Sequence, residues 1–576
     1  MPPSDPEPDL ADDAPLFSRR FMRRARAVGY VVILLAVAVM WSTFDNAADP
    51  DLWHRLATGK IVWDEGAVPM VDRFSYRGKG GVVEDHEWLT GVLFYPLYTA
   101  FGHNIFVWVK IVLFTLILFT IAPPRRYRPH PATAEGGSGV AWTWQPSGWG
   151  RRFRSTVFYA EPDFSVASLC FICVAAFGLL PDICSTIRCH AFTMVFWAAW
   201  IVWLEQARRT GRLPWFAVIV TSIFWMNMHG GYIAGLGLLF VYGAGEWMNG
   251  KSWVPMAALG SASALASLIN PYGLGMWIST VNAIFIPHPE FKSWHAPVLT
   301  DLSNPGFKIL LILSIIAIIL PVTRLRFRQG GALRNHRGDW VPVLVMLIAG
   351  AMSLKQQRNG GLFVICAAIF AWPWLCELSR RAAPVWHKMR RITGTSLWVK
   401  VRNISAGCAV LLIVAMLIAA AEPSGNQFGL LLKSSHAPSA VLELEKRLAA
   451  RPAGSPQERL MVPFNWGSYA LWKLYPQALV SMDGRYELVY TVSRYMENED
   501  FFRARGDWQR VLKESGSTLV LAPADATITQ RLKEDAGWQI IYADKDAPAG
   551  TATGAFKEPA QAKGSVIFGR KTATAP

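Results

Sequence analysis

The sequence predicts a mainly α-helical protein, a polytopic membrane helix bundle followed by a C-terminal extracytoplasmic α/β domain. Three observations predict this fold class. The 576 residues are 52% hydrophobic, and the apolar residues fall into blocks of about 20, the length that crosses a ~30 Å bilayer core. Lys and Arg cluster in alternate loops between these blocks. Short apolar runs of strand length follow the last block.

The apolar blocks predict about eleven transmembrane helices. The first follows a basic cluster and lacks a small-residue cleavage site, so we interpret it as a retained anchor. The apolar segment Trp88 to Gly102 is expected to be an amphipathic helix at the outer interface, because a further span there would move a basic loop outside. The spans are expected near 28–44, 104–122, 164–181, 190–204, 214–229, 231–249, 253–270, 308–322, 339–354, 361–377 and 404–421.

Basic loops orient the predicted bundle. Positively charged loops favour the cytoplasmic side, and the loops that begin near Arg125, Arg208, Arg324 and Arg380 all fall inside if the N-terminus is cytoplasmic. This rule also explains the net charge of +16, so no nucleic-acid partner is expected. The predicted parts are a cytoplasmic tail 1–27, a transmembrane domain 28–421 with a first outer loop 45–103, and an outer domain 422–576.

The C-terminal region has an α/β pattern. Short apolar runs rich in strand-forming residues alternate with helical patterns. The strands are expected at Leu460–Pro463, Ala478–Met482, Thr518–Ala522, Trp538–Tyr542 and Ser565–Phe568, with helices at Ala440–Leu448 and Ala526–Ala536.

The first outer loop is dense with carboxylates and imidazoles. Asp49 and Pro50 predict a helix start, and Gly59 is its expected end. Asp51 and His54 are three residues apart, on one helix face, where a carboxylate fits a general base toward a hydroxyl. The alternative is a solvated loop in which Asp49 is only a helix cap. The candidate catalytic residues are Asp49, Asp51, His54, Asp85 and His86.

Other outer helix ends carry groups suited to an anionic substrate. Arg binds phosphate through paired hydrogen bonds, although Arg188 and Arg358 fit equally well as caps of neighbouring helix ends. Lys110, inside a predicted span, either extends outward or meets a headgroup. The candidate binding residues are Glu87, Lys110, Arg188, His190, Asn227, His229, Arg358 and Asn359.

Metal and cysteine chemistry is less defined. A divalent cation held by Asp49, Asp51 and His54 is an open alternative to a metal-free site. The C-x-x-C pair at Cys170 lies in an apolar block without a second pair, which argues against structural zinc. Cys184 and Cys189 flank a short outer loop and fit either a disulfide or two free thiols.

A series of short motifs resembles the GT-C membrane glycosyltransferases, and most closely a group of bacterial polytopic proteins of that architecture. Asp49-Pro-Asp-Leu-Trp-His and Asp85-His-Glu-Trp-Leu resemble the first outer loop of these enzymes. The supporting motifs follow in order over most of the chain: Asn227-Met-His-Gly-Gly, Asn270-Pro-Tyr-Gly, Trp294-His-Ala-Pro, Arg358-Asn-Gly-Gly, Asn465-Trp-Gly-Ser-Tyr and Asp483-Gly-Arg.

The resemblance implies a multi-pass protein of the bacterial inner membrane that moves a sugar from a polyprenyl-phosphate donor to a glycan, lipid or protein acceptor on the outer face. Asp49 or Asp51 would act as base or position a metal, and cations such as Arg188, His229 or Arg358 would meet the donor phosphate. Because the phosphate is a good leaving group, an inverting reaction needs a base and an anion clamp but no strong acid.

Other functions fit the same sequence. A polymerase or ligase of surface polysaccharide would rely on Arg and His without an acidic base. A transporter of lipid-linked solutes is less favoured, because no paired halves with broken helices are evident. A non-catalytic scaffold of the cell envelope is a further alternative.

Overall fold

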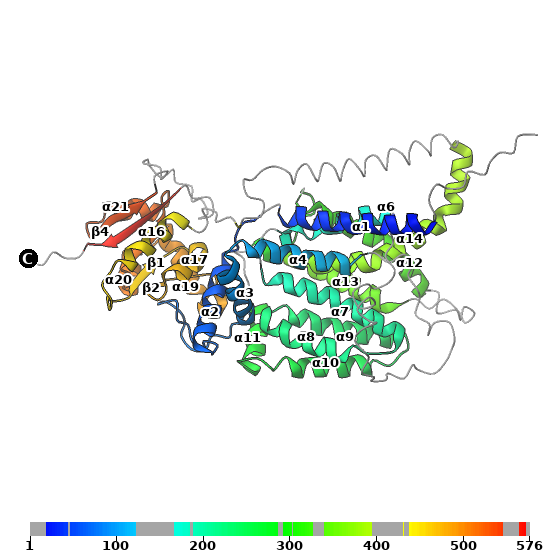
Figure 1. The fold of residues 1–576 in the computed structure, drawn as a ribbon, viewed down its shortest axis with the longest axis horizontal. Helices are drawn as coiled ribbons and strands as arrows, with labels where there is room; N and C mark the ends of the chain where they lie inside the picture. The colour runs from blue at the N-terminus through cyan, green and yellow to red at the C-terminus, as the bar shows by residue number, and fades with distance from the viewer. Residues whose placement is uncertain are drawn as a thin grey trace, which may run out of the picture.

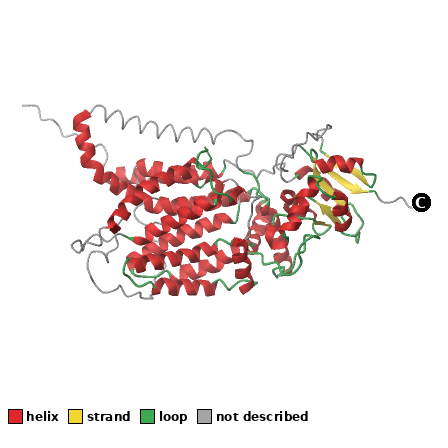
Figure 2. Cartoon of the chain, turned by 180° about the vertical axis from the view of Figure 1, so that it is seen from behind, coloured by secondary structure: helices red, strands yellow, loops and turns green. Residues whose placement is uncertain are grey.

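The computed structural model is mostly helical, with a small sheet at one end (Figures 1 and 2). It describes residues 19–43, 46–122, 166–184, 188–285, 292–301, 303–326, 339–393, 430, 437–544 and 564–571. The predicted span 404–421 and all of the basic loop that begins near Arg125 lie outside the described residues.

Long apolar helices form the bundle. Many of their large hydrophobic side chains are exposed, for example Phe216, Phe224 and Phe240. The bundle contains α1 (Arg19–Ser42), α4 (Ile105–Thr120), α6 (Val166–Gly178), α7 (His190–Thr210), α8 (Trp215–Met228), α9 (Tyr232–Met248), α10 (Val254–Ala266), α11 (Leu274–Phe285), α12 (Pro305–Arg326), α13 (Trp340–Lys355) and α14 (Gly360–Thr393), with short helical turns at Leu180–Cys184, Lys292–Trp294 and Gln357–Asn359.

Each predicted span within the described residues corresponds to one of these helices. The sequence did not predict α11, whose 12 residues are too few to cross a bilayer core of ~30 Å. Within the described residues, one apolar helix, Gln357–Ser379, meets the length and composition expected of a membrane span, and the other apolar helices are shorter.

The helices α2 (Asp51–Glu65) and α3 (Trp88–Phe101) lie between the bundle and the C-terminal part (Figure 1). The helix predicted after Asp49 is present, but its predicted end at Gly59 is wrong: α2 continues to Gly66, whose φ of +70° suits a glycine cap. Gly59 instead lies against Gly91 of α3, where a methyl group on either residue would overlap the other helix's backbone. Small residues therefore let the two helices cross closely.

The C-terminal part contains a five-stranded sheet in the order β2-β1-β3-β5-β4. The first three strands in that order are parallel, and β5 pairs antiparallel with β3 and β4. All strands predicted from the sequence are present. The elements are α16 (Pro438–Ala449), β1 (Glu458–Met461), α17 (Phe464–Leu474), β2 (Ala478–Val480), α18 (Tyr486–Val489), α19 (Val492–Phe502), α20 (Trp508–Ser515), β3 (Leu519–Pro523), α21 (Thr527–Glu534), β4 (Trp538–Ala543) and β5 (Ser565–Arg570).

The first outer loop and the C-terminal part share one hydrophobic core. Trp53 of α2 packs edge-on against Tyr469 of α17 with ring centroids 5.0 Å apart, and both side chains are buried. Ser75 pairs with Val480, so the loop also extends the β2 edge of the sheet. The loop is therefore the surface on which the C-terminal part is held.

Candidate functional site

A cavity of about 620 Å³ lies where the bundle, α2 and the C-terminal part meet. Its size is within the range of roughly 300–1,000 Å³ typical of small-ligand sites. Most of the site residues predicted from the sequence line it, although they come from separate parts of the chain. They are Asp49, Asp51, His54, His86, Glu87, Arg188, His190, His229 and Arg358.

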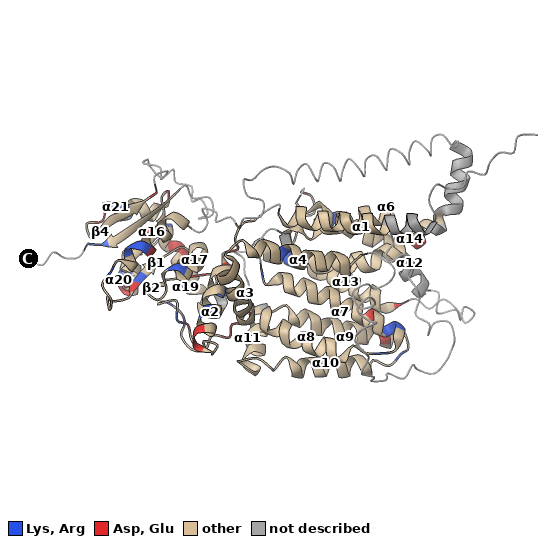
Figure 3. Cartoon of the chain, viewed as in Figure 1, with Lys and Arg blue, Asp and Glu red and all other residues tan. Residues whose placement is uncertain are grey.

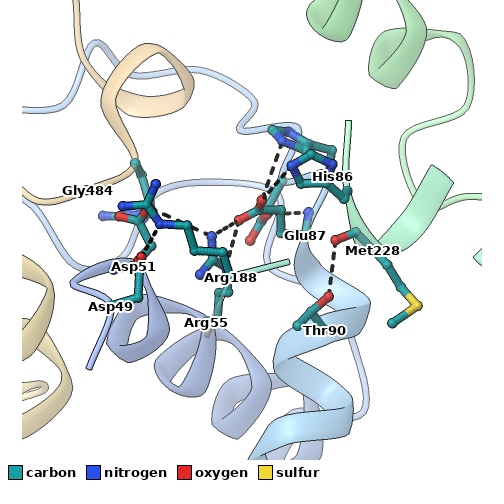
Figure 4. Close-up of polar contacts among 12 residues, drawn as sticks. Asp49, Asp51, Arg55, His86, Glu87, Thr90, Arg188, Met228 and Gly484 are labelled. Carbon is teal, nitrogen blue, oxygen red and sulfur yellow. Dashed lines mark hydrogen bonds and ion pairs between the residues drawn. The ribbon is translucent and has the colours of Figure 1, made fainter. Parts of the chain in front are cut away.

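Asp49 and Asp51 stand side by side but in different environments (Figure 4). The Asp49 carboxylate is fully buried; one oxygen pairs with the Arg188 guanidinium, and the other accepts the Asp51 amide N–H at 2.9 Å. Asp49 therefore accepts the first amide N–H of α2, although the N-cap position itself is occupied by Pro50. The Asp51 carboxylate is 36% exposed and lies 3.8 Å from Arg55, so one of the two acids faces the cavity.

These environments shift the two pKa values in opposite directions. Burial and the adjacent charge of Asp49 raise the pKa of Asp51 to about 7. Burial would also raise the pKa of Asp49, but the charges of Arg188 and Arg55 outweigh it and lower that pKa. Asp49 is thus ionised at neutral pH, whereas Asp51 exchanges its proton there. Burial lowers the pKa of His54 to about 3, which makes His54 a weak base.

Glu87 joins a cation to two imidazoles at the opposite wall. Its carboxylate accepts a hydrogen bond from Arg55 Nε at 2.7 Å, and its other oxygen lies 4.0 Å from the Nε2 atoms of His86 and His229. The His190 ring lies beside His229 with centroids 5.4 Å apart. His86 and Glu87 therefore lie beside His229, which directly follows α8.

The hydrogen bonds of His229 determine which ring nitrogen carries its proton. Its Nδ1 accepts the backbone N–H of Gly231 at 3.0 Å, and Thr193 Oγ1 lies 2.8 Å from the same atom. Because Nδ1 accepts, the neutral ring carries its proton on Nε2. His229 therefore presents an N–H donor toward Glu87 and the cavity.

Arg358 approaches the cavity from the turn between α13 and α14. Its guanidinium stacks on the Trp294 ring, 4.3 Å from the centroid, which favours a planar Arg side chain over Lys. Trp294 and Arg358 belong to two separate motifs of the sequence, and both line the cavity.

The other predicted residues lie outside the cavity lining. The Asp85 carboxylate accepts the backbone N–H of Glu87 at 2.8 Å. Lys110 is buried and donates to Asn46 at 3.3 Å. Asn227 accepts from Trp88 Nε1 at 2.8 Å, and Asn359 donates to the Met352 carbonyl at 3.3 Å. All four hold neighbouring backbone or side chains.

Some cavity residues were missed by the sequence analysis. Arg55 lies four residues after Asp51, a spacing that pairs charges on a helix, so its role was visible in the sequence. The motifs at Asn465 and Asp483 were noted only as family signatures, but Asn465, Gly484 and Arg485 form the C-terminal wall of the cavity. No local pattern in the sequence indicates that contact.

The donor atoms do not fit a divalent cation. Within the described residues, no group of three or more His, Cys, Asp or Glu side chains is placed to hold a metal ion. Asp49 already accepts hydrogen bonds at both carboxylate oxygens, from Asp51 and Arg188. Cys189 is a free thiol, so the disulfide alternative for it is wrong.

Charge is distributed unevenly over the molecule (Figure 3). Few charged residues lie along the bundle helices, whereas acidic and basic side chains gather in the C-terminal part, around α2 and at the far end of the bundle. There, Arg208 is buried with Glu205, Glu246 and Asp339. The cavity and this second ion cluster lie at opposite ends of α7.

No family model and no curated protein matches the sequence. Among solved structures, the chain is similar to the oligosaccharyltransferase of the archaeon Archaeoglobus fulgidus. The apo form matches with a TM-score of 0.54 and 9% identity, over 86% of this chain and 69% of the other. The forms with a tethered acceptor peptide, and with an inhibitory peptide and a dolichol-phosphate, each match with a TM-score of 0.52 and 10% identity, over 88% of this chain and 70% of the other. The chain thus shares its fold with this archaeal oligosaccharyltransferase.

Proposed function

We propose that the protein is an inverting glycosyltransferase that moves a sugar from a polyprenyl-phosphate donor to an acceptor hydroxyl. One observation carries the proposal: an acid pair, Asp49 and Asp51, shares one cavity with a set of cationic and N–H donors. A base and an anion clamp are the two groups that such a transfer requires. The archaeal protein of similar fold was solved with a dolichol-phosphate, a lipid of this class.

Asp51 is the proposed base. Its carboxylate faces the cavity, and its pKa of about 7 lies near the operating pH, where a general base works best. Asp49 is instead held by Arg188 at one oxygen and by a backbone N–H at the other. Its proposed role is to fix the Arg188 guanidinium at the cavity.

Arg188, Arg358 and the His229 Nε2–H form the proposed phosphate clamp. In the reaction, Asp51 takes the proton of the acceptor hydroxyl while the hydroxyl oxygen attacks the anomeric carbon. The bond from that carbon to the phosphate oxygen breaks, and the polyprenyl phosphate leaves with the electron pair. A single displacement inverts the anomeric configuration. The clamp stabilises the negative charge on the departing phosphate, a contribution of about 10²–10³ per donor in comparable sites.

The site also suggests a place in the cell. In this proposal residues 28–421 span the bacterial inner membrane, and the cavity opens at the outer headgroup level, where a lipid-linked donor delivers its phosphate. Residues 422–576 lie on the outer side and close the cavity from above. The archaeal protein was also solved with an acceptor peptide, and here the acceptor is proposed to enter beside the C-terminal wall.

Transfer by the purified protein, reconstituted with a polyprenyl-phosphate-linked sugar, tests the proposal. Asp51→Asn is expected to lose about 10²-fold or more in kcat, since it removes the base. The matched control is Asp64→Asn, because Asp64 lies on the same helix but is half exposed and forms an exposed pair with Lys60. Full activity of Asp49→Asn, Asp51→Asn and the double variant would contradict the proposal. Loss of activity when Arg358 and His190 are substituted, without loss when Asp51 is substituted, would favour a polysaccharide polymerase or ligase instead.

A further inference from the structure

The C-terminal part contacts the proposed base directly. The backbone of Gly484 lies against the Asp51 carboxylate (Figure 4), so closely that a methyl group on Gly484 would overlap one carboxylate oxygen. The Gly484 N–H donates to Ser468 Oγ at 3.0 Å. A side chain on Gly484, which lies between Asp51 and Ser468 of α17, would therefore require the Asp51 carboxylate to move.

A buried ion network holds this turn rigid. The Arg485 guanidinium donates to both oxygens of Asp483, at 2.8 and 2.7 Å, and reaches Asp72 of the first outer loop at 2.7 Å. Tyr490 donates to the same Asp483 carboxylate at 2.7 Å. Since the Asp483 and Arg485 side chains are buried, the fork geometry fixes the backbone on both sides of Gly484.

The C-terminal part also packs against helix α2. Leu52 and Trp53, the two residues that follow Asp51 on its helix, belong to the core shared with α17. The Phe74 carbonyl also accepts the Val480 N–H at 3.0 Å. The distance between α2 and the Asp483-Gly484-Arg485 turn is therefore set by packing and by backbone hydrogen bonds, not by exposed side chains.

We propose that the Asp483-Gly484-Arg485 turn is a positioning element that sets where the Asp51 carboxylate points in the cavity. The C-terminal part then serves the chemical step itself. This inference rests on the proposed function, because it assigns Asp51 the role of base. Gly484 is a positioning residue and touches no reacting atom.

A double-mutant cycle on thermal unfolding tests the contact without any activity assay. Gly484→Ala in the full-length protein is expected to lower Tm by about 3 °C or more, because the new methyl group meets the carboxylate. In an Asp51→Ala background the same change is expected to cost less than half as much, since residues in contact are not additive. Folding of the Gly484→Ala variant only in the Asp51→Ala background would support the proposal equally.

Gly235→Ala is the matched control for this cycle. A methyl group there would overlap the Trp225 side chain rather than Asp51, so its Tm loss is expected to be the same in both backgrounds. An equal Tm loss for Gly484→Ala in both backgrounds, or failure of that variant to fold in both, would overturn the inference.

Kinetics separate positioning from general stability. Gly484→Ala is expected to lower kcat by about 10- to 100-fold, the cost of a small misplacement of a reacting group, while the KM for the lipid-linked donor stays unchanged. An unchanged kcat would overturn the positioning role. A wild-type protein without transfer activity would overturn the proposed function alone, since the unfolding cycle still decides the contact.

Discussion

At the residue scale, two acids that are neighbours in sequence have different tasks in the proposed site. The sequence could identify Asp49 and Asp51 but could not separate them, because their difference lies in what surrounds them. Arg188, which neutralises Asp49, lies two residues before the start of α7. Complete burial of the Asp49 carboxylate and partial exposure of the Asp51 carboxylate follow from the fold and not from the motif.

Nor could the sequence predict which way the side chains at helix ends point. Asn227 and His229 are two residues apart, yet the cavity is lined by His229 while Asn227 accepts from Trp88. Position near the outer end of a span could be predicted from hydropathy. Which side of the helix faces the cavity depends on packing between helices that are distant in sequence.

The phosphate clamp predicts a separation of binding from chemistry. Arg358→Gln is expected to weaken binding of the polyprenyl phosphate alone by about 10-fold or more, since a hydrogen bond to a charged group contributes about 1.5–3 kcal/mol. Asp51→Asn is expected to leave that affinity within about threefold. Titration of the reconstituted protein with the lipid phosphate measures both, and equal affinities for wild type and Arg358→Gln would contradict the clamp.

At the element scale, α2 contributes Asp51, His54 and Arg55 to the cavity, and α3 begins directly after the lining residues His86 and Glu87. The spacing of the two helices depends on glycine. A methyl group on Gly91 would overlap the Arg55 carbonyl. Gly91→Ala is therefore expected to destabilise the protein by about 1–3 kcal/mol and to lower transfer activity, because Asp51 and Arg55 both belong to α2. Gly237→Ala is the control, since the space around Gly237 on α9 is open. Thermal unfolding of both variants checks the prediction, and equal Tm values would refute it.

The buried ion network of the C-terminal turn predicts a large loss of stability. Arg485→Gln leaves the Asp483 and Asp72 carboxylates without their shared cation, and breaking a buried pair costs about 3–5 kcal/mol. Arg510→Gln is the control, because its pair with Glu514 is exposed on α20. An equally small decrease in Tm for both variants would show that the network does not hold the turn.

Much of the element order could be predicted. Blocks of apolar residues marked the bundle helices, and strand-length runs marked all five strands, because both patterns are local. The end of α2 was predicted wrongly because a glycine often ends a helix, whereas Gly59 lies inside α2 and allows α3 to pack closely against it. The tertiary role of a glycine inside a helix has no local signature.

At the scale of the whole molecule, the first outer loop and the C-terminal part were expected as separate units, but they share a core. Hydropathy shows that a residue is buried and not what buries it. The pairing of Ser75 with Val480 joins segments that no local pattern connects. The cavity exists only because these segments meet.

The proposed membrane orientation predicts opposite accessibility at the two ends of α7. This helix has 21 residues, or about 31 Å at 1.5 Å per residue, which matches a ~30 Å bilayer core. A cysteine at Thr300, exposed near the cavity end, is expected to react with an impermeant thiol reagent in intact cells. A cysteine at Arg212, exposed beyond the far end, is expected to react only after permeabilisation, with the wild type as background. The reverse pattern would contradict the orientation.

The pH dependence of transfer tests the central claim most directly, because it asks whether Asp51 is the base beside Asp49. With a pKa of about 7 for Asp51, kcat/KM is expected to fall about tenfold per pH unit on the acidic side, as the carboxylate gains its proton. Asp49→Asn removes the negative neighbour that raises this pKa, so the acidic limb is expected to move to lower pH. Arg55→Gln removes a cation that lowers it, so the limb is expected to move to higher pH. A profile without an acidic limb near neutral pH, or a limb that neither variant moves, would contradict the account.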